Sequence, residues 1–272
     1  MGGLICPVCG AALAADIRTF RCANGHSFDR ARQGYVNLLL RGGSSKKRHG
    51  DDRRMVAARR AFLDGGYYAP LRDLLCELAV RYAPSPADLL DAGCGEGYYT
   101  AAVRAALDAA GKSGAAVGID ISRTALIAAS GRDASLSLAV ASVSALPVAD
   151  GSCGVLLSVF APEDAREFRR ALRPGGLLLK AVPTERHLWG LKAAVYERPY
   201  LNPPPHYAPD GFALLERREL GGSVELTPPQ IENLFMMTPY YYKTGAADQA
   251  KLAALPRLET EIGFAVFALR RQ

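Results

Sequence analysis

The chain has 272 residues, enough for one α/β domain of ordinary size and a small additional unit. Hydrophobic residues make up 49% and charged residues 22%, as in an ordinary soluble globular protein, and the formal net charge is +6. No basic leader precedes an apolar segment at the N-terminus, and no apolar run approaches the length of a membrane span. We therefore expect a cytoplasmic protein without a membrane partner.

The first segment carries two pairs of metal-ligand residues, Cys6 with Cys9 and Cys22 with His26. Their C-x2-C-x12-C-x3-H spacing can place all of them around one Zn²⁺ ion across a short hairpin. Because a set of this kind leaves no open coordination position, we expect the metal to be structural. The spacing thus predicts a zinc ribbon over residues 1–40, folded mostly by metal binding. The spacing does not show whether the ribbon binds nucleic acid, protein or nothing; RNA recognition is what the family resemblance described below implies.

Residues 41–60 are predicted to form a basic connector that leads into a helix. They hold eight Lys or Arg residues and two acidic residues, Asp51 and Asp52. The segment therefore has a net charge of +6, which equals the net charge of the whole chain. Concentrated positive charge suits a polyanionic partner such as a nucleic acid. A solvated, flexible linker is the alternative that the pattern leaves open. Residues 61–272 are expected to form the main domain.

A glycine-rich loop follows the apolar strand predicted at residues 87–90. The strand ends in Asp91, and glycines stand at Gly93, Gly95 and Gly97. Glycines allow a tight turn and a close approach of the backbone to a ligand. The D-x-G-x-G-x-G order differs from the dinucleotide fingerprint and is that of S-adenosylmethionine (SAM) dependent methyltransferases. In those enzymes the carboxylate faces the methionine end of the cofactor.

Two further strands end in residues suited to the same cofactor. The strand at 115–120 ends in Asp120, about twenty residues past the loop, where a carboxylate can accept both ribose hydroxyls. The strand at 137–141 leads to Ser142, in the segment that holds the adenine in such folds. Many relatives have Asp at that position, so the adenine contact is the least defined of the set.

Strands and helices continue to alternate after this point. The expected elements are a helix at 98–110, a strand at 154–160, a helix at 163–172, a strand at 177–182 and a closing strand at 261–269 near the sheet edge. The alternation predicts an α/β fold, a doubly wound, Rossmann-like SAM methyltransferase domain with a small N-terminal zinc ribbon.

The motifs together resemble the bacterial 23S ribosomal RNA guanine-N1 methyltransferases, some of whose members confer macrolide resistance. The likeness covers nearly the whole chain, including the ribbon, G-Y-V-N-L-L at 34–39, A-R-R-A-F-L-D at 58–64, the glycine loop and Met-Thr-Pro at 237–239. The resemblance implies methyl transfer from SAM to N1 of a guanine in a hairpin loop near the peptide exit tunnel. It also implies rRNA processing with 23S RNA as the partner, held by the zinc domains of a homodimer.

The resemblance assigns residues as well. It implies zinc binding by Cys6, Cys9, Cys22 and His26, and a cofactor site lined by Tyr68, Gly95, Glu96 and His187. The run Tyr-Tyr-Tyr-Lys at 240–243 departs from members that carry a tryptophan there. Because relatives modify neighbouring guanines of one loop, this departure leaves the target position open.

The catalytic candidates are His187 and Glu163, each able to assist removal of the guanine N1 proton. The open alternatives are that His187 only hydrogen-bonds the cofactor and that Glu163 is a helix N-terminal acid. Tyrosines could stack the base or face the sulfonium, with plain packing as the other interpretation. They are Tyr240, Tyr241, Tyr242 and Tyr207 for the base, and Tyr68, Tyr98 and Tyr99 for the sulfonium.

Two rival functions remain. One is a SAM-dependent small-molecule methyltransferase, which needs neither a zinc ribbon nor a basic connector. The other is a non-catalytic zinc-ribbon RNA-binding or ribosome-assembly factor, which has no need for the intact glycine loop and Asp120. Measured SAM binding would count against the non-catalytic factor. RNA binding that weakens with salt would count against the small-molecule methyltransferase.

Overall fold

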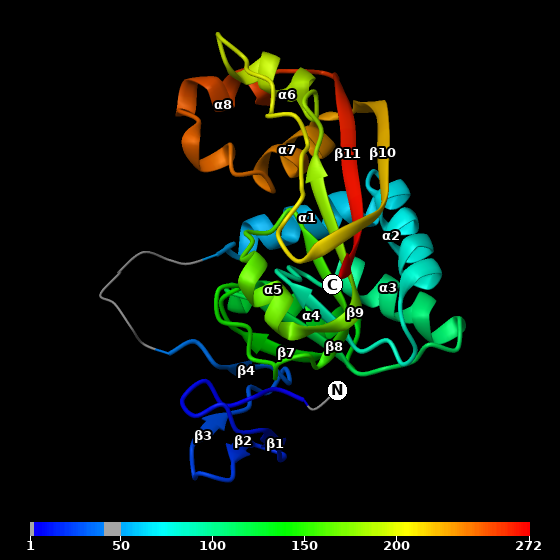
Figure 1. The fold of residues 1–272 in the computed structure, drawn as a ribbon. Coiled ribbons are helices and arrows are strands. Elements are labelled where there is room, and N and C mark those ends of the chain that lie inside the picture. The colour runs from blue at the N-terminus through cyan, green and yellow to red at the C-terminus, as the bar shows by residue number, and fades with distance from the viewer. Residues whose placement is uncertain (1–2, 41–49) are drawn as a thin grey trace.

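The predicted alternation builds an eight-stranded sheet beside a separate three-stranded sheet in a computed structural model that describes residues 3–40 and 50–272 (Figure 1). The strands are β1 (Leu13–Ala15), β2 (Thr19–Cys22), β3 (Ser27–Asp29), β4 (Val36–Asn37), β5 (Leu89–Ala92), β6 (Ala116–Asp120), β7 (Ser137–Val140), β8 (Cys153–Val159), β9 (Leu172–Pro183), β10 (Phe212–Leu226) and β11 (Leu258–Arg271). The helices are α1 (Arg53–Asp64), α2 (Ala69–Tyr82), α3 (Tyr98–Ala109), α4 (Arg123–Arg132), α5 (Ala165–Ala171), α6 (Trp189–Val195), α7 (Pro228–Met236), the 3-10 turn η1 (Tyr241–Lys243) and α8 (Ala246–Ala253).

The large sheet has the order β10-β11-β9-β8-β5-β6-β7-β4. Strands β4 to β9 run parallel, while β11 is antiparallel to both β9 and β10. The chain leaves β5 toward β6 and β7, then returns to β8 on the other side. A reversal of this kind opens a crevice at the carboxyl ends of the strands, where ligands bind in open α/β sheets. The predicted Rossmann-like fold is confirmed.

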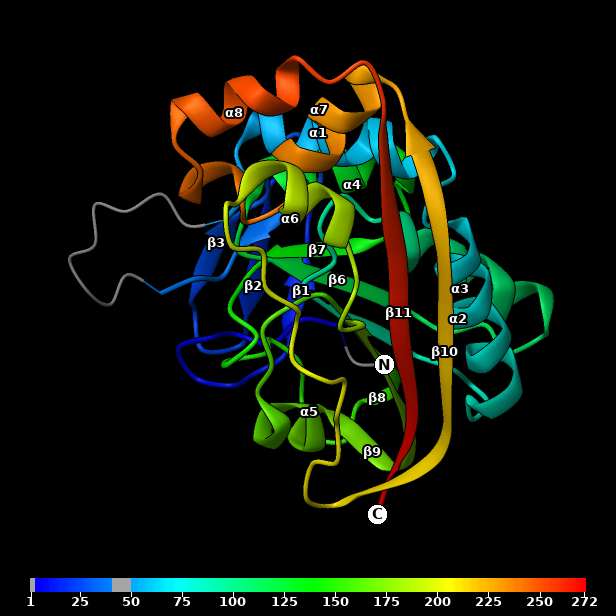
Figure 2. The ribbon, with the colours of Figure 1, turned by 90° about the horizontal axis from the view of Figure 1, so that it is seen from above.

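The two faces of the sheet carry two apolar clusters. Helices α2, α3, α4 and α7 cover one face with residues such as Leu75 and Val103. The other face packs α5 and, unexpectedly, the ribbon, whose Leu4 and Phe20 share a cluster with Ile119 of β6. Figure 2 shows α2 and α3 on one side of the long β10–β11 pair and α5 on the other.

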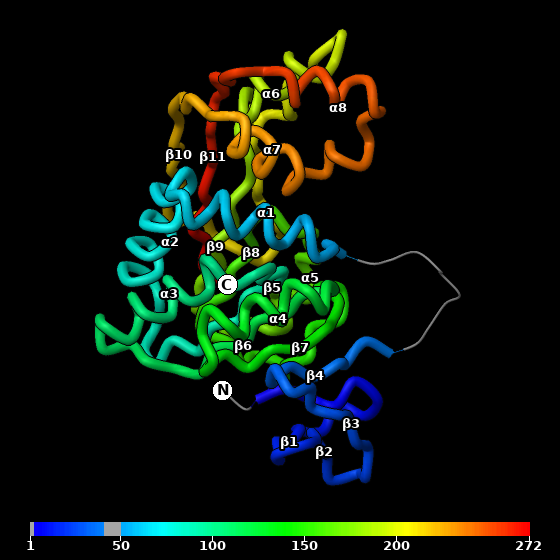
Figure 3. The backbone as a smooth tube through the Cα atoms, turned by 180° about the vertical axis from the view of Figure 1, so that it is seen from behind, coloured from blue at the N-terminus to red at the C-terminus, as the bar shows by residue number. Residues whose placement is uncertain are grey.

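The ribbon is joined to the sheet by backbone as well as by side chains. Ile5 N donates to Pro147 O at 2.9 Å, and β4 adds a parallel strand beside β7 (Figure 3). The predicted ribbon segment 1–40 therefore contributes the last strand of the large sheet. Its division from the main domain stays a prediction.

Strands β9 and β11 begin earlier than the predicted strands at 177–182 and 261–269, and helix α5 and strand β10 also differ from expectation. Helix α5 begins at Ala165 and not at Glu163, because the Asp164 side chain caps it by accepting from Arg166 N and Glu167 N, both at 3.2 Å. Strand β10 was not predicted. It pairs on one side only and carries charged residues over much of its length, so its sequence lacks the apolar run of an interior strand.

Part of the basic connector lies outside the described residues, namely Arg41, Lys46, Lys47 and Arg48. The remaining basic residues lie on α1, where Arg53 and Arg54 are exposed. Among the helices of the described part of the chain, none is long and apolar enough to cross a membrane.

Candidate functional site

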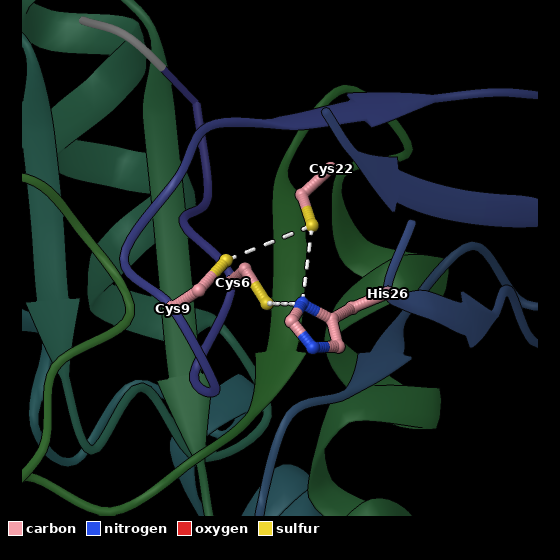
Figure 4. Close-up of side chains that lie close together, drawn as sticks. All are labelled: Cys6, Cys9, Cys22 and His26. Carbon is pink, nitrogen blue, oxygen red and sulfur yellow. Dashed lines mark hydrogen bonds between the residues drawn. The ribbon is translucent and has the colours of Figure 1, made fainter. Parts of the chain in front are cut away.

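The four predicted metal ligands converge in the ribbon (Figure 4). Cys6 and Cys9 lie in the turn before β1, Cys22 ends β2, and His26 precedes β3. The three sulfur atoms and a ring nitrogen of His26 all lie within 4.8 Å of one another. Because the ligands come from turns joined by one short hairpin, their spacing in the sequence suffices to bring them together.

The distances within this cluster fit a zinc ion. His26 Nδ1 lies 3.4 Å from Cys22 Sγ and 3.6 Å from Cys6 Sγ, and the sulfurs of Cys9 and Cys22 are 3.7 Å apart. A tetrahedron with ordinary Zn–S and Zn–N bonds has edges of about 3.6–3.8 Å. A backbone hydrogen bond from Ala11 is the main cause that lowers the pKa of Cys9 to about 6, whereas burial raises the pKa of Cys6. The donor set therefore suits a closed structural site.

A cavity of about 820 Å³ opens at the carboxyl ends of the parallel strands. This volume lies in the upper part of the range of small-molecule sites, about 300–1,000 Å³. One half is lined by the glycine loop, Asp120 and the segment after β7. The other half is lined by the segments after β8 and β9, with Tyr68 from the start of α2 and Tyr240. The crevice that the topology predicts is thus an open site with two unlike halves.

The glycine loop and Asp120 form one hydrogen-bonded unit. Gly95 N donates to Asp120 Oδ2 at 3.0 Å, and Ser122 N donates to Oδ1 at 2.8 Å. Burial raises the pKa of Asp120, and these two backbone N–H groups oppose that rise. Gly93 has a φ of +98° and faces Ala161 so closely that a Cβ would lie 2.5 Å from the Ala161 Cβ. Only glycine fits there without displacing the neighbouring turn.

Most predicted cofactor residues line the cavity, namely Tyr68, Gly93, Gly95, Glu96, Asp120, Ser142 and His187. Asp91 and Gly97 lie behind its wall. The Asp91 side chain is buried, its Oδ2 accepts from Thr100 Oγ1 at 2.6 Å, and its Oδ1 has no hydrogen-bond partner among the described residues. Gly97 sits at the start of α3, where a Cβ would lie 3.2 Å from the Cβ of Ala129 on α4.

The Glu96 carboxylate is turned toward a neighbouring guanidinium. Arg132 Nε donates to Glu96 Oε2 at 2.8 Å, and its Nη2 donates to Oε1 at 3.0 Å. Burial raises the pKa of Glu96, and Arg132 opposes this rise. The same Arg132 bonds to Asp64 at the end of α1, so this guanidinium joins α1 and α4 to the glycine loop.

His187 is held in one protonation state by its partners. Gly263 N donates to His187 Nδ1 at 3.2 Å, so the proton of the neutral ring lies on Nε2. That Nε2 lies 3.3 Å from Tyr68 Oη and donates to it. Burial and the nearby Lys192 lower the pKa of His187 to about 3, so the ring stays neutral at physiological pH.

Several cavity residues were missed or underrated by the sequence analysis. Arg59, assigned to the connector, lines the cavity and donates from Nη2 to Met237 O at 3.1 Å. Tyr99, one of the tyrosines for which plain packing was the other interpretation, also lines it, and its buried hydroxyl has no hydrogen-bond partner among the described residues. Phe160 and Lys180 line the other half. No sequence motif marks the orientation of these side chains.

The tyrosines suggested for base stacking lie in different environments, and only some of them are near the cavity. Tyr240 lines the cavity. Tyr241 packs on Phe235 with ring centroids 5.5 Å apart, Tyr242 is exposed, and Tyr207 is buried against β11. Tyr240 is therefore the member of this group that the structure places at the site.

Comparison with known proteins assigns both units to families. Residues 4–40 match the family model "RlmA, N-terminal", a zinc ribbon, and residues 89–176 match the model of a methyltransferase domain. These matches, with the ligand cluster, confirm the predicted cofactors, SAM and a structural zinc. The solved structure of "a Putative Type II Methyltransferase from Anaeromyxobacter dehalogenans" aligns with a TM-score of 0.51 and 21% identity, covering 73% of this chain and 95% of that one. It supports the fold alone.

Two curated relatives are similar over much of their length. A Streptomyces fradiae protein named "23S rRNA (guanine(748)-N(1))-methyltransferase" is 44% identical over 68% of this chain and 65% of its own. A Micromonospora griseorubida protein named "Putative 23S rRNA (guanine-N(1)-)-methyltransferase" is 42% identical over 68% of this chain and 67% of its own. The chain thus spans about two thirds of these relatives, just under that share for the first. The resemblance seen in the sequence is confirmed, and the chain belongs to the family of 23S rRNA (guanine-N1)-methyltransferases.

Proposed function

We propose that this chain transfers a methyl group from SAM to N1 of a guanine in a hairpin loop of 23S rRNA near the peptide exit tunnel. The observation that carries the proposal is the two-part cavity, in which the glycine-loop half adjoins an aromatic half with room for a base. The zinc ribbon and the named relatives support an RNA substrate.

The chemistry of guanine explains a loop target. N1 carries a proton at neutral pH and lies on the pairing edge of the base. The base must therefore leave its stack before N1 can approach a methyl donor. A loop base costs less to extrude than a paired one, which favours a hairpin loop over a duplex.

The residues of the glycine-loop half fit SAM. Asp120 would accept the ribose hydroxyls, and the segment at Ser142 would hold the adenine. Among the described residues, the Tyr99 hydroxyl and Asp91 Oδ1 have no hydrogen-bond partner. Tyr99 lines the cavity, where a polar ligand can satisfy its hydroxyl, and Asp91 lies just behind the wall of the same half. When bound, SAM supplies an activated methyl group on a sulfonium that leaves readily.

Of the two predicted catalytic residues, we propose Glu163 as the proton acceptor. His187 already uses Nδ1 to accept from Gly263, and its Nε2 carries a proton, so neither nitrogen has a free lone pair. Glu163 is half-exposed, with Oε2 3.2 Å from Lys180 Nζ. It does not itself line the cavity but directly follows Pro162, which does. Its carboxylate would take the N1 proton while the electron pair stays on the guanine. His187 would instead orient the Tyr68 hydroxyl toward the cavity.

The SAM affinity is expected to depend on pH through Asp91. Burial, the main cause, raises the pKa of Asp91 to about 7, so in the free enzyme the carboxyl is largely protonated below that pH. An ammonium group at the methionine end would favour the ionised form. Affinity should therefore rise as pH increases from 5 toward 7, by up to about tenfold per unit, and level off before the amino group of SAM titrates at about pH 7.7–8.0. Calorimetry in buffers of different ionisation enthalpy would count the released proton.

An Asp91→Asn variant tests this assignment. It should bind SAM more weakly and lose the part of the pH dependence between 5 and 7 that Asp91 contributes, while the Asp120 carboxyl remains. His187→Gln should keep the dependence, since the pKa of about 3 places the titration of His187 far below this window. An unchanged pH profile in Asp91→Asn would assign the dependence to another group.

Primer extension across 23S rRNA from cells with and without this gene tests the reaction. N1-methylguanine blocks pairing and stops reverse transcriptase at one position. A stop in the exit-tunnel hairpin that disappears on deletion is the expected result and names the target base. The absence of any difference in that RNA contradicts the proposal and moves the choice to a small-molecule substrate or a non-catalytic role.

The remaining predictions are proposals of the same kind. A ribosomal RNA substrate would place the protein in the cytoplasm. The zinc ribbon would recognise the RNA, a homodimer would present two such ribbons, and the target position would decide whether macrolide resistance follows. RNA affinity that falls steeply with salt is expected, since phosphate contacts release counterions.

A further inference from the structure

The half of the cavity at the carboxyl ends of β8 and β9 presents an exposed aromatic ring. Phe160 follows β8 directly and lines the cavity, yet its side chain is 43% exposed. Most large apolar side chains of this sheet are fully buried. An apolar ring left uncovered inside a cavity offers its face to a ligand.

The backbone at Phe160 is strained to hold that ring in place. Its φ is +53°, in the left-handed region that residues with a Cβ rarely adopt. Phe160 N donates to Ala181 O of β9 at 3.2 Å, and the ring packs against Phe264, with centroids 5.4 Å apart. Strain of this kind persists where surrounding contacts enforce it and is concentrated at ligand sites.

A buried lysine secures the turn that follows Phe160. Lys180 on β9 is 3% exposed, and its Nζ donates to Ala161 O and Ser158 Oγ, both at 3.2 Å. The same ammonium pairs with Glu163 Oε2 at 3.2 Å. Burial lowers the pKa of Lys180, and the nearby Glu163 carboxylate opposes this effect. A buried cation is costly, and here its pairing with Glu163 offsets part of that cost.

We propose that this half of the cavity is a nucleobase subsite, in which the Phe160 ring stacks on the extruded guanine and Lys180 positions the Phe160–Pro162 turn and the Glu163 carboxylate beside it. The inference rests on the proposed function and names residues for it. An extruded base loses its stacking neighbours, and an aromatic face replaces them. The Ala161 Cβ adjoins Gly93, so the turn also sets the base next to the cofactor loop.

Kinetics with matched variants test the subsite. Phe160→Leu keeps the left-handed backbone and apolar bulk but removes the aromatic face, and Phe160→Tyr restores that face. Tyr200→Leu serves as a control, because Tyr200 is an exposed aromatic residue outside the cavity lining. The measurements are kcat/KM for a 23S rRNA hairpin transcript, SAM affinity by calorimetry, and a thermal melt that verifies folding.

Phe160→Leu is expected to lower kcat/KM for RNA by about 5- to 150-fold, with SAM affinity within about twofold of the parent. Phe160→Tyr and Tyr200→Leu should stay close to the parent. Lys180→Met should also lower kcat/KM, and the loss in the double variant Phe160→Leu/Lys180→Met should be smaller than the product of the single losses, because both act on one turn. If the loss in the double variant equals the product of the two single losses, Lys180 does not act through the Phe160 turn and its role is purely structural.

The outcomes separate the two proposals. If the parent enzyme methylates the RNA and Phe160→Leu does so equally well, the subsite is wrong and the proposed function stands. If Phe160→Leu loses SAM binding in proportion to its rate, the ring serves the cofactor and the subsite is again wrong. A parent enzyme that methylates no RNA overturns the function and the subsite together.

Discussion

Gly93→Ala is expected to weaken SAM binding by at least about 30-fold. A methyl group at this position would lie 2.5 Å from the Ala161 Cβ, and the backbone has a φ of +98°. The left-handed angle costs about 1–2 kcal/mol for a residue with a Cβ, and displacing a packed neighbour about 1–3 kcal/mol more. The loop and the turn after β8 must separate, which disturbs both halves of the cavity. A loss of SAM affinity of at least about 30-fold follows.

Gly111→Ala is the matched control for this substitution. Gly111 also has a positive φ, +70°, but no non-neighbouring atom of residues 3–40 or 50–272 lies within 4 Å of the position of its Cβ. It therefore carries the backbone cost without the collision, and it lies outside the cavity lining. Calorimetric titration should show parent-like SAM affinity for Gly111→Ala, with a lower melting temperature. Equal affinities in both variants would mean that the contact with Ala161 does not shape the cofactor site.

Loss of zinc is expected to unfold the ribbon and end RNA methylation while SAM binding persists. Structural zinc contributes about 10–16 kcal/mol in zinc-finger peptides, and the ribbon has few apolar residues of its own. The described residues that line the cavity all lie at position 50 or beyond and none belongs to the ribbon, so the cofactor site does not depend directly on the metal. Cys6 and Cys22 share an apolar cluster with residues of the large sheet. Unfolding of the ribbon would expose that face of the sheet to water, so the melting temperature of the main domain should also fall.

Cys22→Ser tests this expectation, with Cys76→Ser as the control. Cys76 is a half-buried thiol on α2, away from the metal cluster. Metal analysis should find zinc in the parent and in Cys76→Ser and little in Cys22→Ser. Calorimetry should find SAM binding in all three proteins. Full RNA methylation by the zinc-free variant would separate the ribbon from substrate recognition.

The sequence determined the features whose parts are close together in the chain. The zinc ligands lie within one short hairpin, so residue spacing alone brings Cys6, Cys9, Cys22 and His26 into a cluster. The glycine loop follows β5, and Asp120 is the last residue of β6. Because β5 and β6 are adjacent and parallel, both features lie at the carboxyl ends of the strands. Pattern and spacing were sufficient here because local geometry leaves few other arrangements.

Only the tertiary structure decided which distant side chains complete the cavity. Arg59 belongs to a run of basic residues on α1, and nothing in that run shows which guanidinium turns inward. Lys180 interrupts an apolar strand, and its role depends on the turn after β8, which it meets across the sheet. The left-handed angle at Phe160 arises from its bond to Ala181 and its packing on Phe264, contacts made only in the folded chain.

The placement of the ribbon has the same origin. Its ligand spacing predicts the metal site but not the surface on which it packs. That surface is the part of one apolar sheet face that α5 does not cover. The face is formed by strands β5 to β9 lying side by side, so no single strand shows it. Contacts between segments far apart in the sequence depend on three-dimensional packing, which local residue patterns do not encode.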